Sequence, residues 1–358
     1  MSSTLVTGSR RSCAIDDAIH ALPIEWFRPS RAIYWTDQLA TAAIGWTAFA
    51  SAVAARSALS RAALLFVAML ALYRAVLFIH ELTHLARRDV PWFRLAWSAL
   101  VGVPLLIPAF LYEGVHTEHH RQRSYGTEAD PEYFPYGHRR PILILVSLGA
   151  SLLTPLALAI RFGVLAPVSW LVPPLRRVVR ERASALAINP RFVRRAPISA
   201  AGRVEEAAAC VVVWTVAWLW WNQYLPTLAL WCWATTVAAA SGVNAVRTLA
   251  AHRYDRDEGE LTMIAQLVDS CTIDGGRRRR LLTIGHALVA PLGLRFHALH
   301  HWIPSLPYHN LGRAHRRLVA ALGGDAPYRT TVERGFAPLL RDLVLRAHRN
   351  TRNQLSKT

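Results

Sequence analysis

Residues 207–246 read AAACVVVWTVAWLWWNQYLPTLALWCWATTVAAASGVNAV and contain no Asp, Glu, Lys or Arg. The run is long enough for two membrane-spanning helices, each of which needs about 20 apolar residues. Its centre, Asn222-Gln223-Tyr224-Leu225-Pro226, has the composition of a tight polar turn. Tryptophans flank this turn on both sides, as they do where helices leave the hydrocarbon core. The stretch therefore predicts a helical hairpin with spans at about 207–222 and 226–246.

The composition of the whole chain is that of an integral membrane protein. Hydrophobic residues make up 53% of the 358 residues and charged residues only 18%, whereas soluble domains carry about 25% charged residues. The apolar content excludes a disordered chain, and the small number of cysteines excludes a disulfide scaffold. Two further intervals nearly free of charge predict a second hairpin, with spans at about 38–56 and 62–80.

Three other apolar intervals, 95–112, 141–160 and 162–175, are interrupted by prolines. Because a proline inside a helix removes a backbone hydrogen bond, these segments favour interfacial or re-entrant helices over spans. Residues 281–294 are too short to span. The expected fold class is an all-α integral membrane protein, with about four transmembrane helices in two hairpins plus interfacial helices and a cytoplasmic helical cap.

The basic residues predict the orientation of the chain. It carries 41 Lys and Arg against 23 Asp and Glu, a formal charge of +18. With four spans, nearly all of the basic residues fall on one side of the membrane, in segments 1–37, 80–206 and 247–358. The positive-inside rule makes that side cytoplasmic. Both termini are therefore expected on the cytoplasmic side of a bacterial inner membrane.

This division gives a cytoplasmic N-terminal segment at 1–37, a membrane domain at 38–330 and a basic C-terminal tail at 331–358. The first 37 residues are polar, so a removable signal peptide is not expected. The positive charge suits anionic lipid headgroups, and no nucleic-acid-binding module accompanies it. The membrane is therefore the expected partner of the basic surface, and nucleic acid is not.

The 15 histidines are concentrated in three short motifs. The first, at 80–84, reads HELTH; the second, at 116–120, reads HTEHH; the third, at 297–301, reads HALHH. Spacings of three and four residues put side chains on one face of a helix, so each motif is expected to aim its imidazoles at one point. Eight imidazoles exceed the needs of one tetrahedral metal and suit two first-row metal ions.

We predict that all eight histidines of the motifs bind metal: His80, His84, His116, His119, His120, His297, His300 and His301. The histidines outside any such spacing are predicted not to bind metal: His20, His138, His286 and His315. His252 follows the last predicted span directly. If that helix continues past the bilayer surface, His252 supplies a ninth imidazole to one of the two metals.

Motifs of the form H-x-x-x-H, H-x-x-H-H and H-x-x-H-H on a four-span chain resemble the histidine boxes of the membrane fatty acid desaturases. The first two lie close together and the third follows far downstream, after the hairpin. The segment 302–311, WIPSLPYHNL, is similar to the one that follows the third box in bacterial acyl desaturases. The resemblance covers about residues 35–330 and is strong at the boxes.

The resemblance implies a membrane-bound, O₂-dependent fatty acyl desaturase, in which two non-haem iron ions in the cytoplasmic cap serve to introduce a double bond into an acyl chain. An unactivated methylene offers no acidic proton, so a cofactor must carry the hard step, and no catalytic residue beyond the metal centre is expected. The substrate is a lipid or an acyl thioester. Since the chain has no haem, flavin or cysteine-cluster motif, electrons come from an external ferredoxin, rubredoxin or cytochrome-type donor with its reductase.

The resemblance also implies residues that orient the metal ligands. Glu81 and Glu118 within the boxes, and His309 behind the third box, are candidates for this role. Acyl-CoA desaturases of animals look similar near His252, with a ligating histidine just after the fourth span and an asparagine one turn earlier. In this chain Asn244 lies two turns earlier, so it remains a candidate only through a bridging water.

Several alternatives stay open. A hydroxylase, an acetylenase or a carotenoid-modifying oxygenase would use the same scaffold, because these outcomes differ only in how the substrate is placed. A distant alternative is an intramembrane zinc metalloprotease, since HELTH also satisfies H-E-x-x-H, with Glu81 as general base and Asp274 as a third ligand. It leaves six ordered histidines without a role. A metal transporter would carry histidines inside its spans, and none lies in 38–79 or 207–246.

Overall fold

The computed structural model describes residues 15–185, 188–189, 192–255, 261–275 and 280–355. Their regular structure is almost entirely helical, which confirms the expected all-α class. Two strands of two residues each, β1 (Thr272–Ile273) and β2 (Val332–Glu333), pair in parallel. The chain forms two compact units, here called the membrane unit (31–119 and 146–245) and the cap unit (1–30, 120–145 and 246–358), and each is described by itself.

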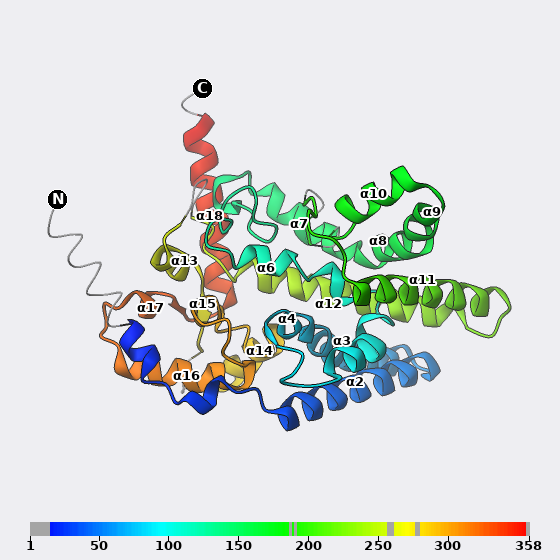
Figure 1. The fold of residues 1–358 in the computed structure, drawn as a ribbon, viewed down its shortest axis with the longest axis horizontal. Coiled ribbons are helices and arrows are strands. Elements are labelled where there is room, and N and C mark those ends of the chain that lie inside the picture. The colour runs from blue at the N-terminus through cyan, green and yellow to red at the C-terminus, as the bar shows by residue number, and fades with distance from the viewer. Residues whose placement is uncertain (1–14, 186–187, 190–191, 256–260, 276–279, 356–358) are drawn as a thin grey trace. The chain divides into compact units, whose positions relative to one another are not determined.

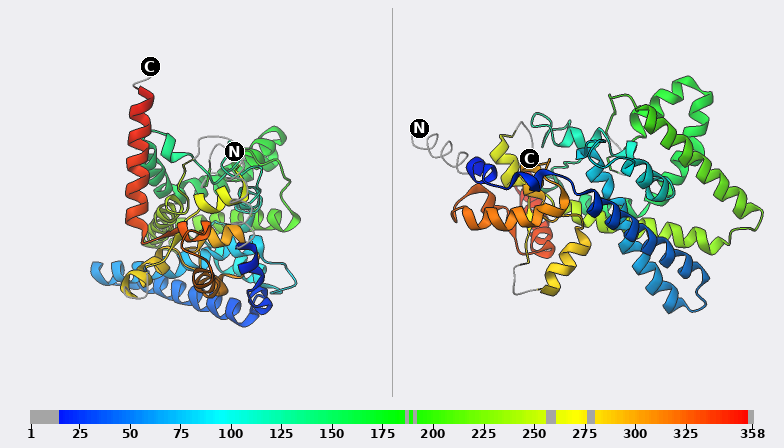
Figure 2. Two further views of the ribbon diagram at one scale, coloured as in Figure 1. Left: turned by 90° about the vertical axis from the view of Figure 1, so that its left-hand side faces the viewer. Right: turned by 60° about the horizontal axis from the view of Figure 1, so that its bottom comes forward.

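The membrane unit begins with a helical hairpin, as the sequence predicts. Helices α2 (Arg31–Ala54) and α3 (Ala58–Val76) run antiparallel and side by side (Figures 1 and 2). The side chain of Ser57 caps α3 by accepting a hydrogen bond from the backbone N–H of Ser60. Gly45 allows the close approach of the two helices, because a Cβ atom there would lie 2.6 Å from Leu72 Cγ. After Leu77 the chain continues into α4 (Phe78–His84), which therefore extends directly from the packed hairpin.

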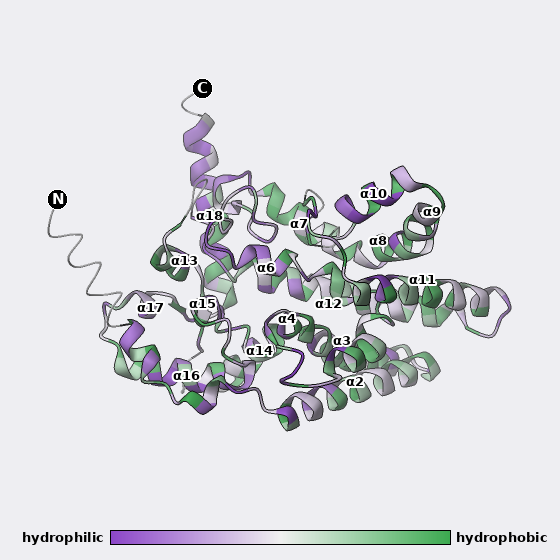
Figure 3. Ribbon diagram, viewed as in Figure 1, coloured by the Kyte–Doolittle hydropathy of each residue, from purple (hydrophilic) through white to green (hydrophobic). Residues whose placement is uncertain are grey.

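The second hairpin of the membrane unit also follows the sequence prediction. Helix α11 (Ala200–Trp221) ends where the polar turn begins, and α12 (Thr227–Leu249) starts after Pro226. Gln223 in the turn adopts a positive φ of 64°, and the backbone N–H of Tyr224 donates to Leu219 O. Figure 3 shows that hydrophobic residues predominate along α3 and α11, as expected of helices that face lipid.

Shorter helices complete the membrane unit: α5 (Phe93–Trp97), the π-helix η2 (Ser98–Gly102), η3 (Ala109–Leu111), α6 (Val115–His119), α7 (Ile142–Leu152), α8 (Thr154–Ile160), the π-helix η5 (Arg161–Leu165), α9 (Ala166–Leu171) and α10 (Pro173–Arg182). A buried ion pair ties η5 to α11, with 2.6 Å between Arg161 Nη2 and Glu206 Oε1. Arg176 contacts the other oxygen of Glu206, also at 2.6 Å. The buried carboxylate is therefore paired on both sides, as burial of a charge requires.

Within the described part of the chain, four helical segments are long and apolar enough to cross a membrane: Ala58–His84, Thr154–Leu171, Ala200–Trp221 and Thr227–Leu249. Three of them overlap the predicted spans at 62–80, 207–222 and 226–246. The predicted span at 38–56 falls largely in α2, a continuous helix outside these four, in which half of the apolar residues are alanines. Residues 154–171, expected to be interfacial, are among the four. Their prolines fall in the first turns of α8 and α9, where a missing N–H costs little.

The cap unit is built from short helices: η1 (Ile24–Phe27), η4 (Tyr136–His138), α13 (Met263–Asp269), α14 (Arg280–Val289), α15 (His297–Trp302), α16 (Tyr308–Ala321), α17 (Pro327–Thr330) and α18 (Phe336–Leu355). Strand β1 lies in a small core formed by Ala250, Cys271, Ile273 and Leu339. Single β-bridges join Ser270 to His252 and Thr272 to Phe296. The segment around β1 thus brings the chain after α12 beside the start of α15.

The C-terminal residues expected to form a basic tail fold as part of the cap unit. Strand β2 pairs with β1, and α18 forms one long helix that buries Leu339, Leu343 and Ala347 on one face (Figure 2). The spacing of four residues gives this helix an apolar stripe, and Arg341, Arg349 and Arg352 are among its exposed residues.

Candidate metal centre

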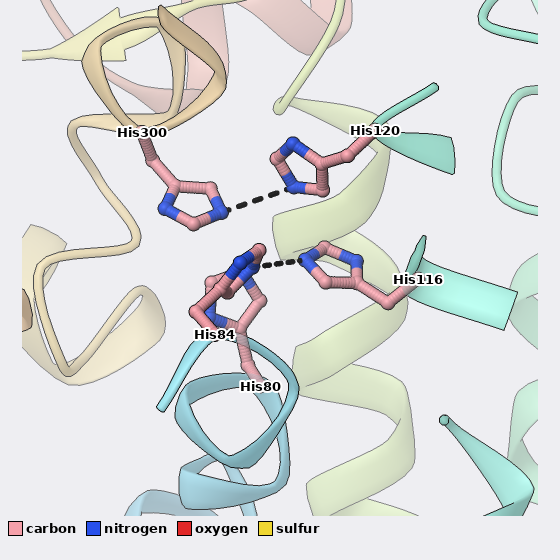
Figure 4. A group of neighbouring side chains, drawn as sticks. All are labelled: His80, His84, His116, His120 and His300. Atoms are coloured by element: carbon pink, nitrogen blue, oxygen red, sulfur yellow. Dashed lines mark hydrogen bonds between the residues drawn. The ribbon is translucent and has the colours of Figure 1, made fainter. Parts of the chain in front are cut away.

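The membrane unit brings three box histidines together. His80 and His84 lie on α4 and His116 on α6, and each offers a ring nitrogen within 4.8 Å of the others. Figure 4 shows His84 and His116 facing each other, with 3.0 Å between their Nε2 atoms. The rings of His80 and His116 have centroids 4.4 Å apart, and both side chains are buried. The spacing of four residues within the first box therefore produces a pair on one helix face, as predicted.

Tyr112 orients the His116 ring. It lies four residues before His116, in the turn that precedes α6. Its ring stacks on the imidazole with centroids 4.8 Å apart, and its hydroxyl lies 2.9 Å from His116 Nδ1. Because Nδ1 is engaged by this hydroxyl, His116 presents its Nε2 atom toward His84. Tyr112 belongs to no histidine box, and it lies in the turn before α6, where Gly114 has a positive φ of 80°. Helical spacing therefore does not predict its contact with His116.

Glu81 lies between a tyrosine and a metal-ligand candidate. Tyr34 on α2 donates a hydrogen bond of 2.5 Å to Glu81 Oε2, and the other carboxylate oxygen is 3.5 Å from His80 Nδ1. All three side chains are buried. This arrangement fits the predicted role of Glu81 as a group that orients a ligand, and it adds Tyr34, which the sequence analysis missed.

We expect Glu81→Gln and Tyr34→Phe each to weaken metal binding about 10- to 100-fold, the usual cost of losing an outer partner of a metal ligand. Both changes preserve side-chain volume, so the hairpin itself should remain folded. Metal content after dialysis against a graded series of chelator concentrations measures the effect. If both variants retain as much metal as the unaltered protein, Glu81 and Tyr34 contribute to packing and do not orient a metal ligand.

The cap unit brings five histidines together in two sets. His252, His297 and His301 form one set, with Nε2 atoms 3.0 Å apart for His252 and His297, and 3.1 Å apart for His297 and His301. His120 and His300 form the other, with 3.1 Å between their Nε2 atoms (Figure 4). The His120 ring also stacks on His301, with centroids 4.4 Å apart.

The third box is therefore divided, contrary to the expectation that each motif aims all its imidazoles at one point. His297 and His301 face His252, whereas His300 faces His120. The cause is helix geometry. Consecutive residues of an α-helix are about 100° apart around the axis, so His300 and His301 on α15 diverge.

His252 is presented by an extended segment. Helix α12 ends at Leu249, so the helix does not continue to His252 as the sequence analysis supposed. Instead, His252 forms a β-bridge with Ser270, and the neighbouring Arg253 N–H donates to Asp269 O at 2.7 Å. The side chain is buried with 4% of its surface exposed. The structure thus places His252 beside His297 and His301 by a route that helical periodicity does not describe.

Asp269 and Tyr125 lie behind His252. The Tyr125 hydroxyl is 2.7 Å from His252 Nδ1 and donates to Asp269 Oδ2 at 2.8 Å. Burial raises the pKa of the Asp269 carboxyl to about 6, and the hydrogen bond from Tyr125 opposes this rise. Burial also raises the pKa of the Tyr125 phenol well above its ordinary value, with the charge of Asp269 as a further cause. The phenol is therefore protonated at neutral pH.

Four predicted site residues remain: His119, Glu118, Asn244 and His309. His119 is buried at the end of α6, with its ring centroid 6.0 Å from that of His116. Glu118 on α6 and Asn244 on α12 are half-buried. His309 on α16 accepts a hydrogen bond of 3.2 Å from the backbone N–H of Ser30, and burial lowers the pKa of its imidazole.

The histidines predicted not to bind metal lie outside the histidine groups of the membrane unit and the cap unit. His138 donates to Asp255 O at 2.7 Å, and His286 packs against Phe336. His20 is exposed. His315 Nδ1 lies 2.8 Å from the Tyr328 hydroxyl, and its Nε2 lies 3.4 Å from Asp274 Oδ2. Asp274, the third ligand in the protease alternative, is therefore engaged with His315.

Comparison with known proteins identifies the family. The family model described as fatty acid desaturase matches residues 56–332. The chain belongs to the fatty acid desaturase family. A ceramide hydroxylase from Caulobacter vibrioides (strain NA1000 / CB15N) is 40% identical over 337 residues, which cover 91% of this chain and 93% of the relative. No solved structure matches the chain.

Membership of the fatty acid desaturase family confirms the resemblance read from the histidine boxes. The chain is an oxidoreductase of a family of diiron membrane enzymes, it is integrated into a membrane, and it acts on lipid.

Proposed function

We propose that this protein is a membrane-bound, O₂-dependent hydroxylase of ceramide-type lipids. The observation that carries the proposal is the 40% identity with a ceramide hydroxylase over nearly the full length of both chains. The similarity to this relative extends over the membrane spans and the cap unit. It therefore covers the regions that would bind the lipid as well as the histidine boxes. Desaturation of an acyl chain remains the second candidate, because the family model bears that description.

We propose that the histidines hold two iron ions. The donor set fits: in each of the two units buried or half-buried imidazoles have Nε2 atoms 3.0–3.1 Å apart, and imidazole nitrogen is a preferred ligand of iron. His80, His84 and His116 of the membrane unit would contribute ligands to one ion, and His252, His297 and His301 of the cap unit would contribute ligands to the other. His119, His120 and His300 would supply further imidazoles.

Chain connectivity keeps two of the box histidines together. His119 is the last residue of the first segment of the membrane unit, and His120 is the first residue of the next segment of the cap unit. Consecutive Cα atoms are 3.8 Å apart across a trans peptide bond, so these two histidines stay adjacent however the units are placed. The second box therefore links the histidine sets of both units covalently.

When bound, the iron ions would supply the O₂ activation that oxidation of an unactivated methylene requires. The residues of the chain hold and orient the metals: the histidines through Nε2, and Tyr112 and Tyr125 by engaging the opposite ring nitrogen of His116 and His252. The overall conversion inserts one oxygen atom into a C–H bond and reduces the other to water with two electrons and two protons. We propose that an external ferredoxin, rubredoxin or cytochrome-type donor on the cytoplasmic side supplies these electrons.

The test is the mass of the lipid product. We expect the protein, expressed in a bacterial host supplied with ceramide, to produce ceramide heavier by one oxygen atom, as measured by mass spectrometry with ¹⁸O₂ as the label. A matched culture that expresses the His300→Ala variant is the control. A product lighter by two hydrogens would instead establish the desaturase candidate. Conversion of fatty acyl lipids without any change in ceramide would exclude ceramide as the substrate.

A further inference from the structure

A buried polar cluster that none of the histidine boxes includes lies behind His252 in the cap unit. It consists of Tyr125, Tyr133, Asp269 and Ser270, each at most 5% exposed. Tyr125 follows the second box by five residues, whereas Asp269 ends α13, so the cluster joins parts of the chain that are far apart in sequence. Its members form hydrogen bonds with one another and with His252.

Asp269 is the acceptor at the base of this cluster. Its Oδ2 atom accepts the Tyr125 hydroxyl at 2.8 Å, and its Oδ1 atom accepts the Tyr133 hydroxyl at 3.2 Å. The backbone N–H of Asp255 also points to Oδ1, at 3.4 Å. A carboxylate that receives donors at both oxygens is held in a fixed orientation, and it receives the single phenolic proton of Tyr125.

The direction of the remaining hydrogen bond follows from that proton. Because Tyr125 donates its only proton to Asp269, its oxygen can only accept at the 2.7 Å contact with His252 Nδ1. Ser270 donates its hydroxyl to Gln266 O and thus also offers only an oxygen to Nδ1, at 3.4 Å. The proton of the neutral His252 imidazole therefore lies on Nδ1, and the lone pair lies on Nε2.

We infer that Tyr125 and Asp269 are positioning residues that fix His252 in the tautomer able to bind a metal through Nε2. That atom is 3.0 Å from His297 Nε2, on the side of the ring where the other two histidines of its set converge. A histidine ligand whose second nitrogen is anchored in this way binds metal with a defined ring orientation. The inference rests on the proposed metal centre and adds to it the residues that make His252 a ligand.

The test is a titration with cobalt(II), whose visible absorption reports its coordination. The full-length protein in detergent, stripped of metal with a chelator, should bind two cobalt ions. In Tyr125→Phe we expect one of the two binding events to weaken about 10- to 100-fold, with a changed absorption band, while the other is unaffected. Asp269→Asn should weaken the same event, because an amide can donate to Tyr125 and turn the phenolic proton toward His252.

Tyr254→Phe is the matched control. Tyr254 is equally buried and its ring centroid lies 5.7 Å from that of His252, but its hydroxyl donates to Thr248 O at 2.8 Å and not to the cluster. Two cobalt ions should bind to this variant with unchanged affinity. Equal weakening in Tyr254→Phe would reduce the effect to packing and overturn the inference, as would unchanged binding in Tyr125→Phe. If the unaltered protein binds no cobalt, the metal centre of the proposed function fails instead.

Discussion

Replacement of His300 by alanine is expected to abolish lipid oxidation and to lower the iron bound per chain. His300 is 2% exposed and its Nε2 atom lies 3.1 Å from that of His120. Its loss removes one of the two facing imidazoles and leaves a cavity beside His120. Loss of an outer partner of a metal ligand already costs 10- to 100-fold, so turnover should fall by more than about 100-fold here. Product formation per mole of purified protein and iron content by mass spectrometry measure the two effects.

His138→Ala is the control for this variant. His138 is half-buried in the cap unit and donates to a backbone carbonyl, that of Asp255, and it lies in neither histidine set. It should retain both turnover and iron. Full turnover in the His300 variant would end the assignment of the third box as a metal-binding motif, whereas equal losses in both variants would point to general destabilisation of the cap unit.

The parts of the fold that sequence predicted are those governed by local rules. The charge-free run at 207–246 predicted the turn of the α11–α12 hairpin to within one residue at each side, because membrane spans require an uninterrupted apolar stretch. Helix α11 nevertheless begins at Ala200, seven residues before the predicted span. The sequence does not predict the span-like segment at 154–171, because prolines within an apolar stretch usually interrupt a helix. Whether a proline breaks a helix depends on its position within the first turn, and that boundary was not visible in the sequence.

The candidate site shows the same distinction between local and non-local information. The box spacing identified the histidines, but it could not show that His297 and His300, on one short helix, face different partners. Nor could it identify Asp269, which lies 144 residues from Tyr125 and belongs to no motif. Such contacts depend on how β1 and α13 pack in the cap unit. The choice between hydroxylation and desaturation depends on substrate placement, which no spacing of ligands encodes.

Replacement of His252 by glutamine is expected to remove about half of the bound iron. His252 belongs to the cap-unit set with His297 and His301, and glutamine is too weak a ligand to replace an imidazole whose Nε2 lies 3.0 Å from that of His297. The ion bound by His80, His84 and His116 should remain, because those histidines belong to the other proposed site. Iron per chain and turnover after purification measure the loss.

The matched control is His315→Gln, since His315 is equally buried in the cap unit and contacts Tyr328 and Asp274 instead. If His252→Gln keeps all of its iron and its turnover, His252 is a structural residue and the cap-unit ion has at most three histidine ligands.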